Sequence, residues 1–402
     1  MQTNIIRHFL DSADGREAER ILRNCVHCGF CTATCPTYQM LNDERDGPRG
    51  RIYLIKQFLE TGQVSERSRR HLDRCLTCRS CETTCPSGVQ YGRLIDIGRN
   101  LVEAQLKRPL RERALRWGLR KVLPYPKRFA TLIKLAQPFK PLLSDTVKEK
   151  IPPVARPLAW PARKHARHML VLEGCVQATS TPDTNAHAAR VLDRLGISLL
   201  RTPAAGCCGA VSQHLGAPGE ALGFIKRNID AWWPLIEQGA EAIIFSASGC
   251  GAMVREYGHL LRDDADYAAK AALVSSLSKD LSEVLLDEDL SGLNLKPGEE
   301  KIAVHCPCTL QHALQLDGAV ESILQKAGFN LASTRERHLC CGSAGTYSIL
   351  QPQLSQRLLR NKLDALSIDK PDCVVTANVG CQMHLQSKAK IPVQHWIELL
   401  DP

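Results

Sequence analysis

The segment "NCVHCGFCTATCP", residues 24–36, places four cysteines within eleven residues. The chain nearly repeats it about fifty residues later as "RCLTCRSCETTCP", residues 74–86. In both stretches three cysteines follow one another at intervals of three residues, so one tight loop of backbone directs all three thiols to the same centre. The fourth cysteine stands four residues further on and precedes a proline, which restricts the backbone and turns the chain away.

These two runs have the form C-x2-C-x2-C-x3-C-P, the bacterial [4Fe–4S] signature, in which the last cysteine of each run binds the cluster of the other run. This rule predicts two clusters with crossed ligands. The first takes Cys25, Cys28, Cys31 and Cys85, and the second takes Cys75, Cys78, Cys81 and Cys35. Two zinc sites are the alternative, since zinc also accepts four thiolates, but zinc ribbons pair two C-x2-C knuckles and do not use four-cysteine runs closed by proline.

The segment between the runs is expected to be helical. In "GRIYLIKQFLETG", residues 50–62, the apolar residues Ile52, Ile55 and Leu59 fall on one side of a helix, and Gly62 suits its carboxyl end. A helix inserted between the two runs indicates a helical type of two-cluster ferredoxin domain over residues 1–102.

The chain has 402 residues and 18 cysteines, with apolar and charged fractions of 44% and 23%, which is typical of a folded protein with more than one domain. No apolar segment approaches the about 18 residues of a membrane-spanning helix, and no hydrophobic core of a signal peptide follows Met1. These features predict a cytoplasmic protein with neither a signal peptide nor a transmembrane segment. In that reducing compartment the cysteines are expected to be metal ligands or redox groups rather than disulfides.

A basic, proline-rich stretch follows. Residues 107–140 hold eleven Lys and Arg against the single acid Glu112, while the whole chain has a formal net charge of +10. Nine prolines between positions 109 and 161 limit helices here, such as residues 111–122, to short pieces. Residues 103–165 are therefore interpreted as a connector, whose charge predicts either a solvated helical face or a docking surface for an acidic subunit or an anionic membrane. No recognised nucleic-acid module accompanies it, so nucleic acid is not an expected partner.

The second half of the chain repeats a different cysteine pattern. Each repeat has one cysteine, a Cys-Cys-Gly triplet 32 residues later, and a last cysteine 43 residues (first repeat) or 41 residues (second repeat) after the triplet begins. We call these units the CCG repeats. Their eight shared cysteines are candidate metal ligands or redox groups: Cys175, Cys207, Cys208, Cys250, Cys308, Cys340, Cys341 and Cys381.

The two CCG repeats also have matching patterns of secondary structure. "HMLVLEGC" (168–175) and "KIAVHCPC" (301–308) are predicted strands that lead into the first cysteine, and "EAIIFSASGC" (241–250) and "CVVTANVGC" (373–381) are predicted strands that lead into the last. The segments "DTNAHAARVLDRLG" and "SQRLLRNKLDAL" have helical periodicity. Alternating strands and helices predict α/β units with largely parallel sheets, which carry the cysteines at the carboxyl ends of their strands.

The predicted fold class is thus a multidomain α+β and α/β protein, with a helical two-cluster ferredoxin domain followed by two α/β CCG units that face each other. The predicted boundaries are residues 1–102 for the ferredoxin-like domain, 103–165 for the basic connector, 166–295 for the first CCG repeat and 296–402 for the second.

Two four-cysteine runs followed by two CCG repeats resemble the iron–sulfur subunits shared by glycolate oxidase, anaerobic glycerol-3-phosphate dehydrogenase and heterodisulfide reductase. The resemblance covers nearly the whole chain. Three segments are most similar to the glycolate oxidase member: "GFCTATCPTY" (29–38), "DGPRGRIYLIK" (46–56) and "SGVQYGRLIDIGR" (87–99).

This resemblance implies the electron-transfer subunit of an oxidoreductase complex, a glycolate dehydrogenase whose acceptor is neither NAD nor O2. A flavoprotein partner with FAD would oxidise glycolate, or D-lactate, and two [4Fe–4S] clusters would pass electrons toward a quinone-type acceptor at the cytoplasmic face of the inner membrane. The sequence has no G-x-x-x-x-G-K-[ST] motif and no complete dinucleotide fingerprint. No catalytic residue and no flavin site are therefore expected on this chain.

The CCG repeats depart from the fullest form of the family, in which each repeat ends in C-x2-C. Met253 and His384 stand where the fifth cysteines belong. A further metal centre in the repeats, with His384 as a nitrogen ligand and Cys306 as a spare thiol, is an alternative to reduced or redox-active thiols. Two other functions stay open: a heterodisulfide or thiol–disulfide reductase that uses the vicinal cysteines, and the iron–sulfur subunit of a glycerol-3-phosphate or lactate dehydrogenase.

Overall fold

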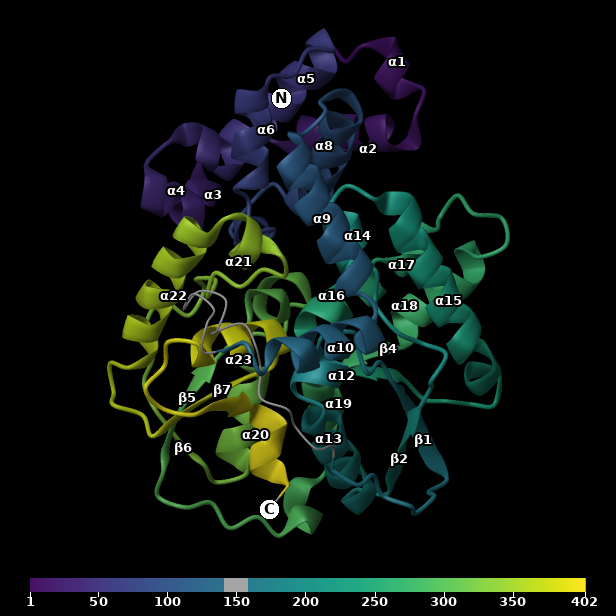
Figure 1. The fold of residues 1–402 in the computed structure, drawn as a ribbon, viewed down its shortest axis with the longest axis vertical. Coiled ribbons are helices and arrows are strands. Elements are labelled where there is room, and N and C mark those ends of the chain that lie inside the picture. The colour runs from purple at the N-terminus through teal and green to yellow at the C-terminus, as the bar shows by residue number, and fades with distance from the viewer. Residues whose placement is uncertain (141–157, 402) are drawn as a thin grey trace.

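The computed structural model describes residues 1–140 and 158–401. Its elements form a helical N-terminal region at one end of the molecule and two α/β units beneath it (Figure 1). This arrangement confirms the fold class predicted from the cysteine patterns and the hydrophobic periodicity. Among the described residues, no helix combines the length and the apolar character that a bilayer crossing requires.

The N-terminal region consists of helices joined by the loops that carry the two four-cysteine runs. The predicted helix between the runs is α5, and it ends at Gly62, whose φ of 69° lies in the left-handed region that suits glycine. Ile55 of α5 packs so closely against α8 that a Cβ on Gly98 would lie 2.7 Å from its side chain. The elements are α1 (Arg7–Leu10), α2 (Ala13–Asn24), α3 (Phe30–Ala33), α4 (Pro36–Leu41), η1 (Glu44–Asp46), α5 (Pro48–Thr61), α6 (Glu66–Asp73), α7 (Ser80–Thr83) and α8 (Tyr91–Gln105).

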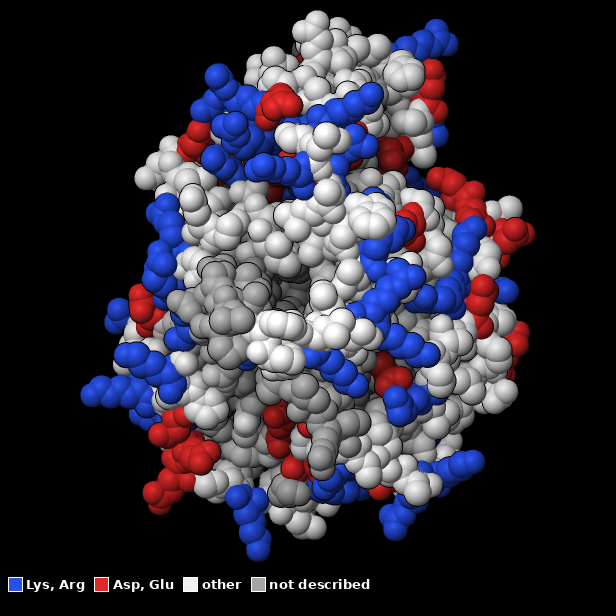
Figure 2. All heavy atoms as spheres, viewed as in Figure 1, with Lys and Arg blue, Asp and Glu red and all other residues white. Residues whose placement is uncertain are grey.

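Two basic helices join this region to the rest of the molecule: α9 (Leu110–Val122) and α10 (Pro126–Ala136). Arg108, just before α9, pairs with Asp73 of α6 at 2.7 Å, and Arg120 pairs with Glu220 of the first α/β unit at 3.3 Å. Figure 2 shows a band of Lys and Arg on the face that carries these helices. Part of that charge therefore holds the N-terminal region and the first unit together.

The first α/β unit has a four-stranded parallel sheet in the order β2-β1-β3-β4. Its strands are β1 (Arg167–Val171), β2 (Ile197–Arg201), β3 (Ile243–Phe245) and β4 (Ser278–Asp280). Its helices are α12 (Gln177–Ser180), α13 (Asp183–Arg194), α14 (Ala210–His214), α15 (Pro218–Glu237), α16 (Ser248–Arg255), α17 (Tyr257–Leu260), α18 (Ala268–Leu277), α19 (Leu281–Asp287) and η3 (Leu290–Leu293).

The second unit repeats this topology with a parallel sheet in the order β6-β5-β7-β8. Its strands are β5 (Lys301–His305), β6 (Asn330–Leu331), β7 (Cys373–Thr376) and β8 (Val393–His395). Its helical elements are η4 (Thr309–Ala313), α20 (Ala319–Lys326), α21 (Tyr347–Leu350), α22 (Pro352–Leu366), α23 (Val379–Gln386) and η5 (Trp396–Leu400). The two segments predicted to be helical are α13 and α22, which lie before the first triplet and after the second, respectively.

The two units share one hydrophobic core. Val171 and Ile244 of the first sheet belong to the same buried cluster as Val304 and Val375 of the second. The loops that follow β3 and β7 also meet, because the backbone nitrogen of Ser248 donates to the oxygen of Ala377 at 3.1 Å. These loops lead into the last cysteine of each CCG repeat, so the shared core positions the two sets of thiols.

Candidate metal and redox centres

Both four-cysteine runs form a tight loop by placing left-handed residues on either side of the middle cysteine. These residues are His27 (φ 58°) and Gly29 (φ 87°) in the first run, and Thr77 (φ 53°) and Arg79 (φ 60°) in the second. Residues other than glycine adopt this conformation at a cost, and it is rarest for β-branched residues such as Thr77. Strain at matching positions of both loops is typical of a backbone that must wrap closely around a ligand.

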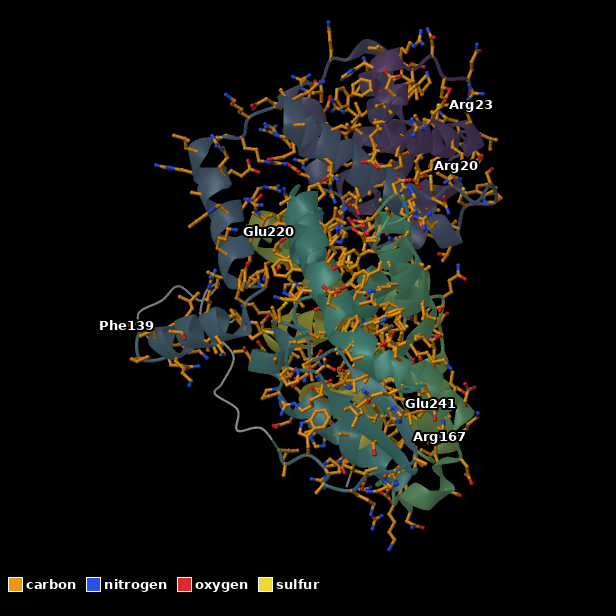
Figure 3. The ribbon with its side chains drawn as sticks, turned by 90° about the vertical axis from the view of Figure 1, so that its right-hand side faces the viewer. Arg20, Arg23, Phe139, Arg167, Glu220 and Glu241 are labelled. Atoms are coloured by element: carbon orange, nitrogen blue, oxygen red, sulfur yellow. The ribbon has the colours of Figure 1, made fainter. Side chains whose placement is uncertain are left out.

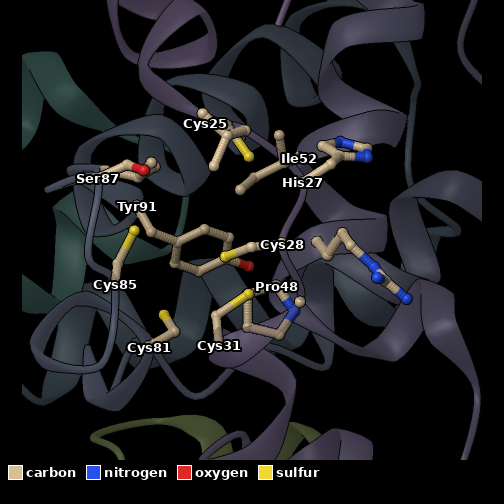
Figure 4. A pocket seen from close by; sticks show the side chains of 14 residues that line it. Cys25, His27, Cys28, Cys31, Pro48, Ile52, Cys81, Cys85, Ser87 and Tyr91 are labelled. Carbon is tan, nitrogen blue, oxygen red and sulfur yellow. The ribbon is translucent and has the colours of Figure 1, made fainter.

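The thiols predicted for the first cluster line one pocket (Figure 4). Cys25, Cys28 and Cys31 come from the first run and Cys85 from the second, while apolar side chains of α5 and of the segment after the second run complete the walls. Burial and the neighbouring thiols of Cys25 and Cys85 raise the pKa of Cys31 to about 11. Thiols this crowded ionise together only when a cationic centre binds them.

The thiols predicted for the second cluster also come together, deeper in the molecule. Cys35, Cys75 and Cys81 are buried and Cys78 is partly exposed. Burial raises the pKa of Cys81 well above its usual range, and the other three thiols of this set raise it further. Cys81 also borders the pocket of the first set, so the two sets are neighbours.

The spacing of these eight thiols fits clusters better than single ions. Ligands of one tetrahedral zinc ion stand about 3.3–3.8 Å apart, given metal–ligand distances of about 2.0–2.3 Å. In the described part of the chain, the groups of three ligand atoms that lie within 4.8 Å of one another include none of the eight thiols. Thiols around a cluster stand further apart, because iron and sulfide fill the space between them.

Two buried side chains beside the second set were not predicted from the sequence. Arg51 of α5 is 1% exposed and donates a hydrogen bond to the backbone oxygen of His71 at 2.8 Å. Burial opposes its charge, but Tyr91 and the thiols of Cys75 and Cys35 raise the pKa of Arg51. The Tyr91 hydroxyl donates to Cys75 Sγ at 3.7 Å. Both groups would stabilise negative charge on ligated thiolates.

A signal for Arg51 was present in the sequence. It lies four residues before Ile55 on the apolar side of α5, and a charged residue on a buried helix face requires a partner. Tyr91 had no comparable signal, because an aromatic residue at the start of a helix is most often simply part of the core.

The four cysteines of the first CCG repeat converge in the structure. A hydrogen bond with Cys207 and burial raise the pKa of Cys175, and the thiol of Cys250 raises it further. Hydrogen bonds from Cys175 and Cys208 instead lower the pKa of Cys207, which also accepts a hydrogen bond from the backbone of Gly209 at 3.5 Å. The neighbouring thiols therefore raise the pKa of Cys175 but lower that of Cys207.

The backbone conformation explains why each triplet ends in glycine. Gly209 and Gly342 have φ values of 95° and 89°, and a Cβ on Gly342 would lie 2.6 Å from the backbone oxygen of Ser355. The amide of Gly342 donates to Cys340 Sγ at 3.4 Å. Only glycine fits this close approach while it turns the chain around the thiols.

The four cysteines of the second CCG repeat form a row. The Sγ atoms of Cys308 and Cys340 are 3.8 Å apart, and the thiol of Cys341 is hydrogen-bonded to those of Cys340 and Cys381. Asn378 donates to Cys381 Sγ at 3.4 Å. The structure thus brings together the four predicted cysteines of this repeat, as it does in the first.

His305, the last residue of β5, was not predicted as a site residue. One of its ring nitrogens and the sulfurs of Cys341 and Cys381 lie within 4.8 Å of one another, and all three residues are buried. Burial lowers the pKa of His305 well below its usual range, with a further contribution from Lys362. His384, the alternative nitrogen ligand named from the sequence, pairs through Nε2 with the hydroxyl of Ser355 at 3.0 Å.

The second thiol set of the N-terminal region lies against the second CCG repeat. Burial raises the pKa of Cys78, and the thiol of Cys308 is the neighbour that raises it most. Tyr347 of this repeat donates to the backbone oxygen of Arg74 at 3.0 Å. The first thiol set, the second thiol set and the thiols of the second repeat therefore follow one another in space.

Comparisons with known proteins agree with this organisation. Residues 21–89 match the family model of a 4Fe-4S dicluster domain, and residues 169–255 and 302–386 match that of a cysteine-rich domain. The glycolate oxidase iron–sulfur subunit of Escherichia coli (strain K12) is 54% identical over 402 residues, which are 100% of this chain and 98% of that protein. The probable glycolate oxidase iron–sulfur subunit of Bacillus subtilis (strain 168) is 29% identical over 92% of this chain and 90% of its own. Lactate utilization protein A of Oceanobacillus iheyensis is 25% identical over 56% of this chain and 93% of its own.

Proposed function

Because the chain belongs to the family of glycolate oxidase iron–sulfur subunits, we propose that it conducts electrons away from a flavoprotein subunit that oxidises glycolate to glyoxylate. That oxidation releases two electrons and two protons, and FAD on the partner takes up the electron pair. This chain then carries the electrons singly toward a quinone-type acceptor, which takes up two electrons and two protons to become a quinol.

The proposal rests on two neighbouring sets of four thiols. Each set takes three cysteines from one run and the fourth from the other run. A [4Fe–4S] cluster, when bound, exchanges one electron at a time. Arg51 and Tyr91 hold positive charge and a hydrogen bond beside the second set. The four-cysteine runs and their surroundings are therefore suited to one-electron transfer and not to oxidation of a hydroxy acid.

We assign the entry of electrons to the first thiol set. Cys28 is exposed, and two large apolar neighbours in its run, Val26 and Phe30, are 66% and 61% exposed. Exposed apolar side chains that surround a functional group are typical of a protein docking site. The flavoprotein is the partner that this surface fits, since the first set is the one nearest to solvent.

The direct test is reduction by substrate. Glycolate added to the isolated, cluster-loaded chain should leave the visible absorption of the clusters unchanged, because the proposal assigns uptake of the electron pair to the FAD of the partner. Addition of the flavoprotein subunit should then bleach that absorption. Bleaching by glycolate in the absence of the flavoprotein would contradict the assignment of substrate oxidation to the partner.

A thiol–disulfide reductase is the second function considered, and burial of the vicinal cysteines disfavours it. Cys207 and Cys208 are 0% and 3% exposed, and Cys340 and Cys341 are 2% and 1% exposed. A disulfide substrate must bring its sulfur into contact with the attacking thiolate. The buried CCG thiols are out of reach of such a substrate.

We further propose that the chain associates peripherally with an anionic membrane surface through α10. Leu132 and Leu135, three residues apart on α10, are 51% and 64% exposed, and Phe139, in the turn that follows the helix, is 60% exposed. Lys127 and Lys134 are exposed on the same helix. Figure 3 shows α10 at the edge of the molecule with Phe139 at its outer end. Exposed apolar side chains with basic neighbours are typical of a helix that lies in a bilayer interface.

Replacing Leu132 and Leu135 together by glutamate should weaken binding to vesicles of phosphatidylglycerol and phosphatidylethanolamine by at least about tenfold. Each large apolar side chain contributes about 1.5–3 kcal/mol when it is fully buried, and the new charges are repelled by the lipid. Vesicle co-sedimentation measures the effect, and a rise in salt should weaken wild-type binding. Leu273→Glu is the matched control, since this leucine is 40% exposed on α18. If the Leu132 and Leu135 double variant still bound vesicles but no longer bound the flavoprotein, these leucines would belong to a protein interface, and the membrane proposal would be refuted.

A further inference from the structure

The second CCG repeat contains a buried imidazole without a hydrogen-bond partner. His305 is 1% exposed, and neither of its ring nitrogens has a partner in the described part of the chain. His395, which is equally buried, has both nitrogens satisfied: Nε2 pairs with Ser246 O at 2.8 Å, and Nδ1 accepts from the amide of Ile397 at 3.2 Å. A buried polar group without a partner is destabilising, so the contrast indicates that His305 binds a ligand.

The surroundings of His305 fit one metal ion. Its nitrogen and the sulfurs of Cys341 and Cys381 all lie within 4.8 Å of one another, and a tetrahedral ion would draw them to about 3.3–3.8 Å apart. Imidazole and thiolate together are the donors that zinc and ferrous iron accept. Neither the eight thiols of the N-terminal region nor those of the first CCG repeat form such a group among the described residues.

Comparison of the two repeats shows that this imidazole is specific to the second. His305 stands three residues before the first cysteine of its repeat, Cys308, and the equivalent residue before Cys175 is Leu172. Leu172 is 2% exposed and belongs to an apolar cluster. The same position on the repeated fold thus carries an apolar side chain in the first repeat, where Cys208 belongs to its cluster and Cys250 packs against it, and an imidazole beside the corresponding thiols in the second.

We propose that the second CCG repeat binds a single divalent transition-metal ion, zinc or ferrous iron, through the imidazole of His305 and the thiolates of Cys341 and Cys381. Binding releases the two thiol protons, and the two thiolates balance the charge of the ion. Cys340, hydrogen-bonded to Cys341, is the nearest candidate for a fourth ligand. This site is separate from the two cluster sites and does not depend on the proposed oxidation of glycolate.

The test is the metal content of the full-length chain, purified anaerobically and analysed for zinc and iron together. The wild type should hold one metal ion per chain beyond the about eight irons of the two clusters. His305→Leu, which copies the first repeat, should lose that ion while the cluster EPR signals stay unchanged. His305→Cys should keep the ion, because a thiolate replaces the imidazole. His384→Gln is the matched control and should also keep it.

A spectroscopic readout separates ligation from a structural role. For zinc, X-ray absorption at the zinc edge should show nitrogen and sulfur ligands in the wild type and sulfur alone in His305→Cys; for iron, Mössbauer spectra should show a high-spin ferrous component distinct from the clusters. If His305→Leu does not fold, the spectra of the wild type and of His305→Cys still show whether residue 305 binds the metal ion. A wild type with no metal beyond its clusters, or a His305→Leu variant that folds and retains the extra ion, would overturn the proposal.

Discussion

Replacing Cys28 by alanine should remove about four of the about eight irons that two [4Fe–4S] clusters hold and spare the others. Cys28 lines the pocket that also holds Cys25, Cys31 and Cys85, so its loss leaves that set with three thiols. The second set receives no ligand from Cys28 and keeps all four of its own. Iron analysis and spin quantification by EPR after anaerobic purification measure the change.

Cys373→Ala is the control for this experiment, because Cys373 is a buried cysteine of β7 that belongs to none of the predicted sets. It should keep its full iron content, which separates loss of a ligand from a general effect of removing a buried thiol. Crossed ligation also predicts that Cys85→Ala, in the other run, removes the same EPR signal as Cys28→Ala. If Cys28→Ala and Cys85→Ala lost different EPR signals, the crossed pairing would be wrong. A wild type that contained zinc in place of iron would contradict the clusters themselves.

Replacing Cys78 by alanine should separate oxidation of the substrate from delivery of its electrons. Cys78 belongs to the second set, and its thiol lies beside that of Cys308 in the second CCG repeat, on the inward side of the N-terminal region. In the complex with the flavoprotein, glycolate should still reduce the flavin at the wild-type rate. Reduction of a quinone or of a dye beyond this chain should fall by at least about tenfold, since changes at a metal site cost about that much or more.

Stopped-flow absorbance follows both steps in one sample, the flavin in the first phase and the acceptor in the second. The control is again Cys373→Ala, which should leave both phases unchanged. If Cys78→Ala slowed the flavin phase equally, the second set would be needed for assembly of the complex. If acceptor reduction stayed at the wild-type rate, electrons would leave without passing this set, and the proposed order of the centres would be wrong.

The features that depend on short intervals follow from the amino-acid sequence alone. Three cysteines at spacings of three residues are directed to one centre by the local backbone, whatever the rest of the fold does. The helix α5 followed from the apolar residues Ile52, Ile55 and Leu59 and from the glycine at its end, because amphipathic periodicity depends only on neighbouring residues. The parallel sheets of the CCG repeats followed from alternating strands and helices for the same reason.

Which centres are neighbours depends on how the chain packs in three dimensions. Cys78 and Cys308 are more than 200 residues apart in the sequence, and nothing local distinguishes the thiols of the second CCG repeat, which meet the N-terminal region, from those of the first. The basic connector shows the same limit. Its composition predicted a charged face, but the pairing of Arg120 with Glu220 depends on how α9 packs against the first unit, and composition does not determine packing.

The imidazole beside the thiols of the second CCG repeat shows why sequence spacing alone does not identify every neighbour of a thiol. Sequence spacing favoured His384, which stands where a fifth cysteine would be, yet that side chain pairs with Ser355. The imidazole near Cys341 and Cys381 comes from His305 at the end of a different strand. Ligands held by one loop can be read from their intervals, whereas ligands brought together from separate strands and helices are set by the register and packing of the sheet, which no local pattern of residues encodes.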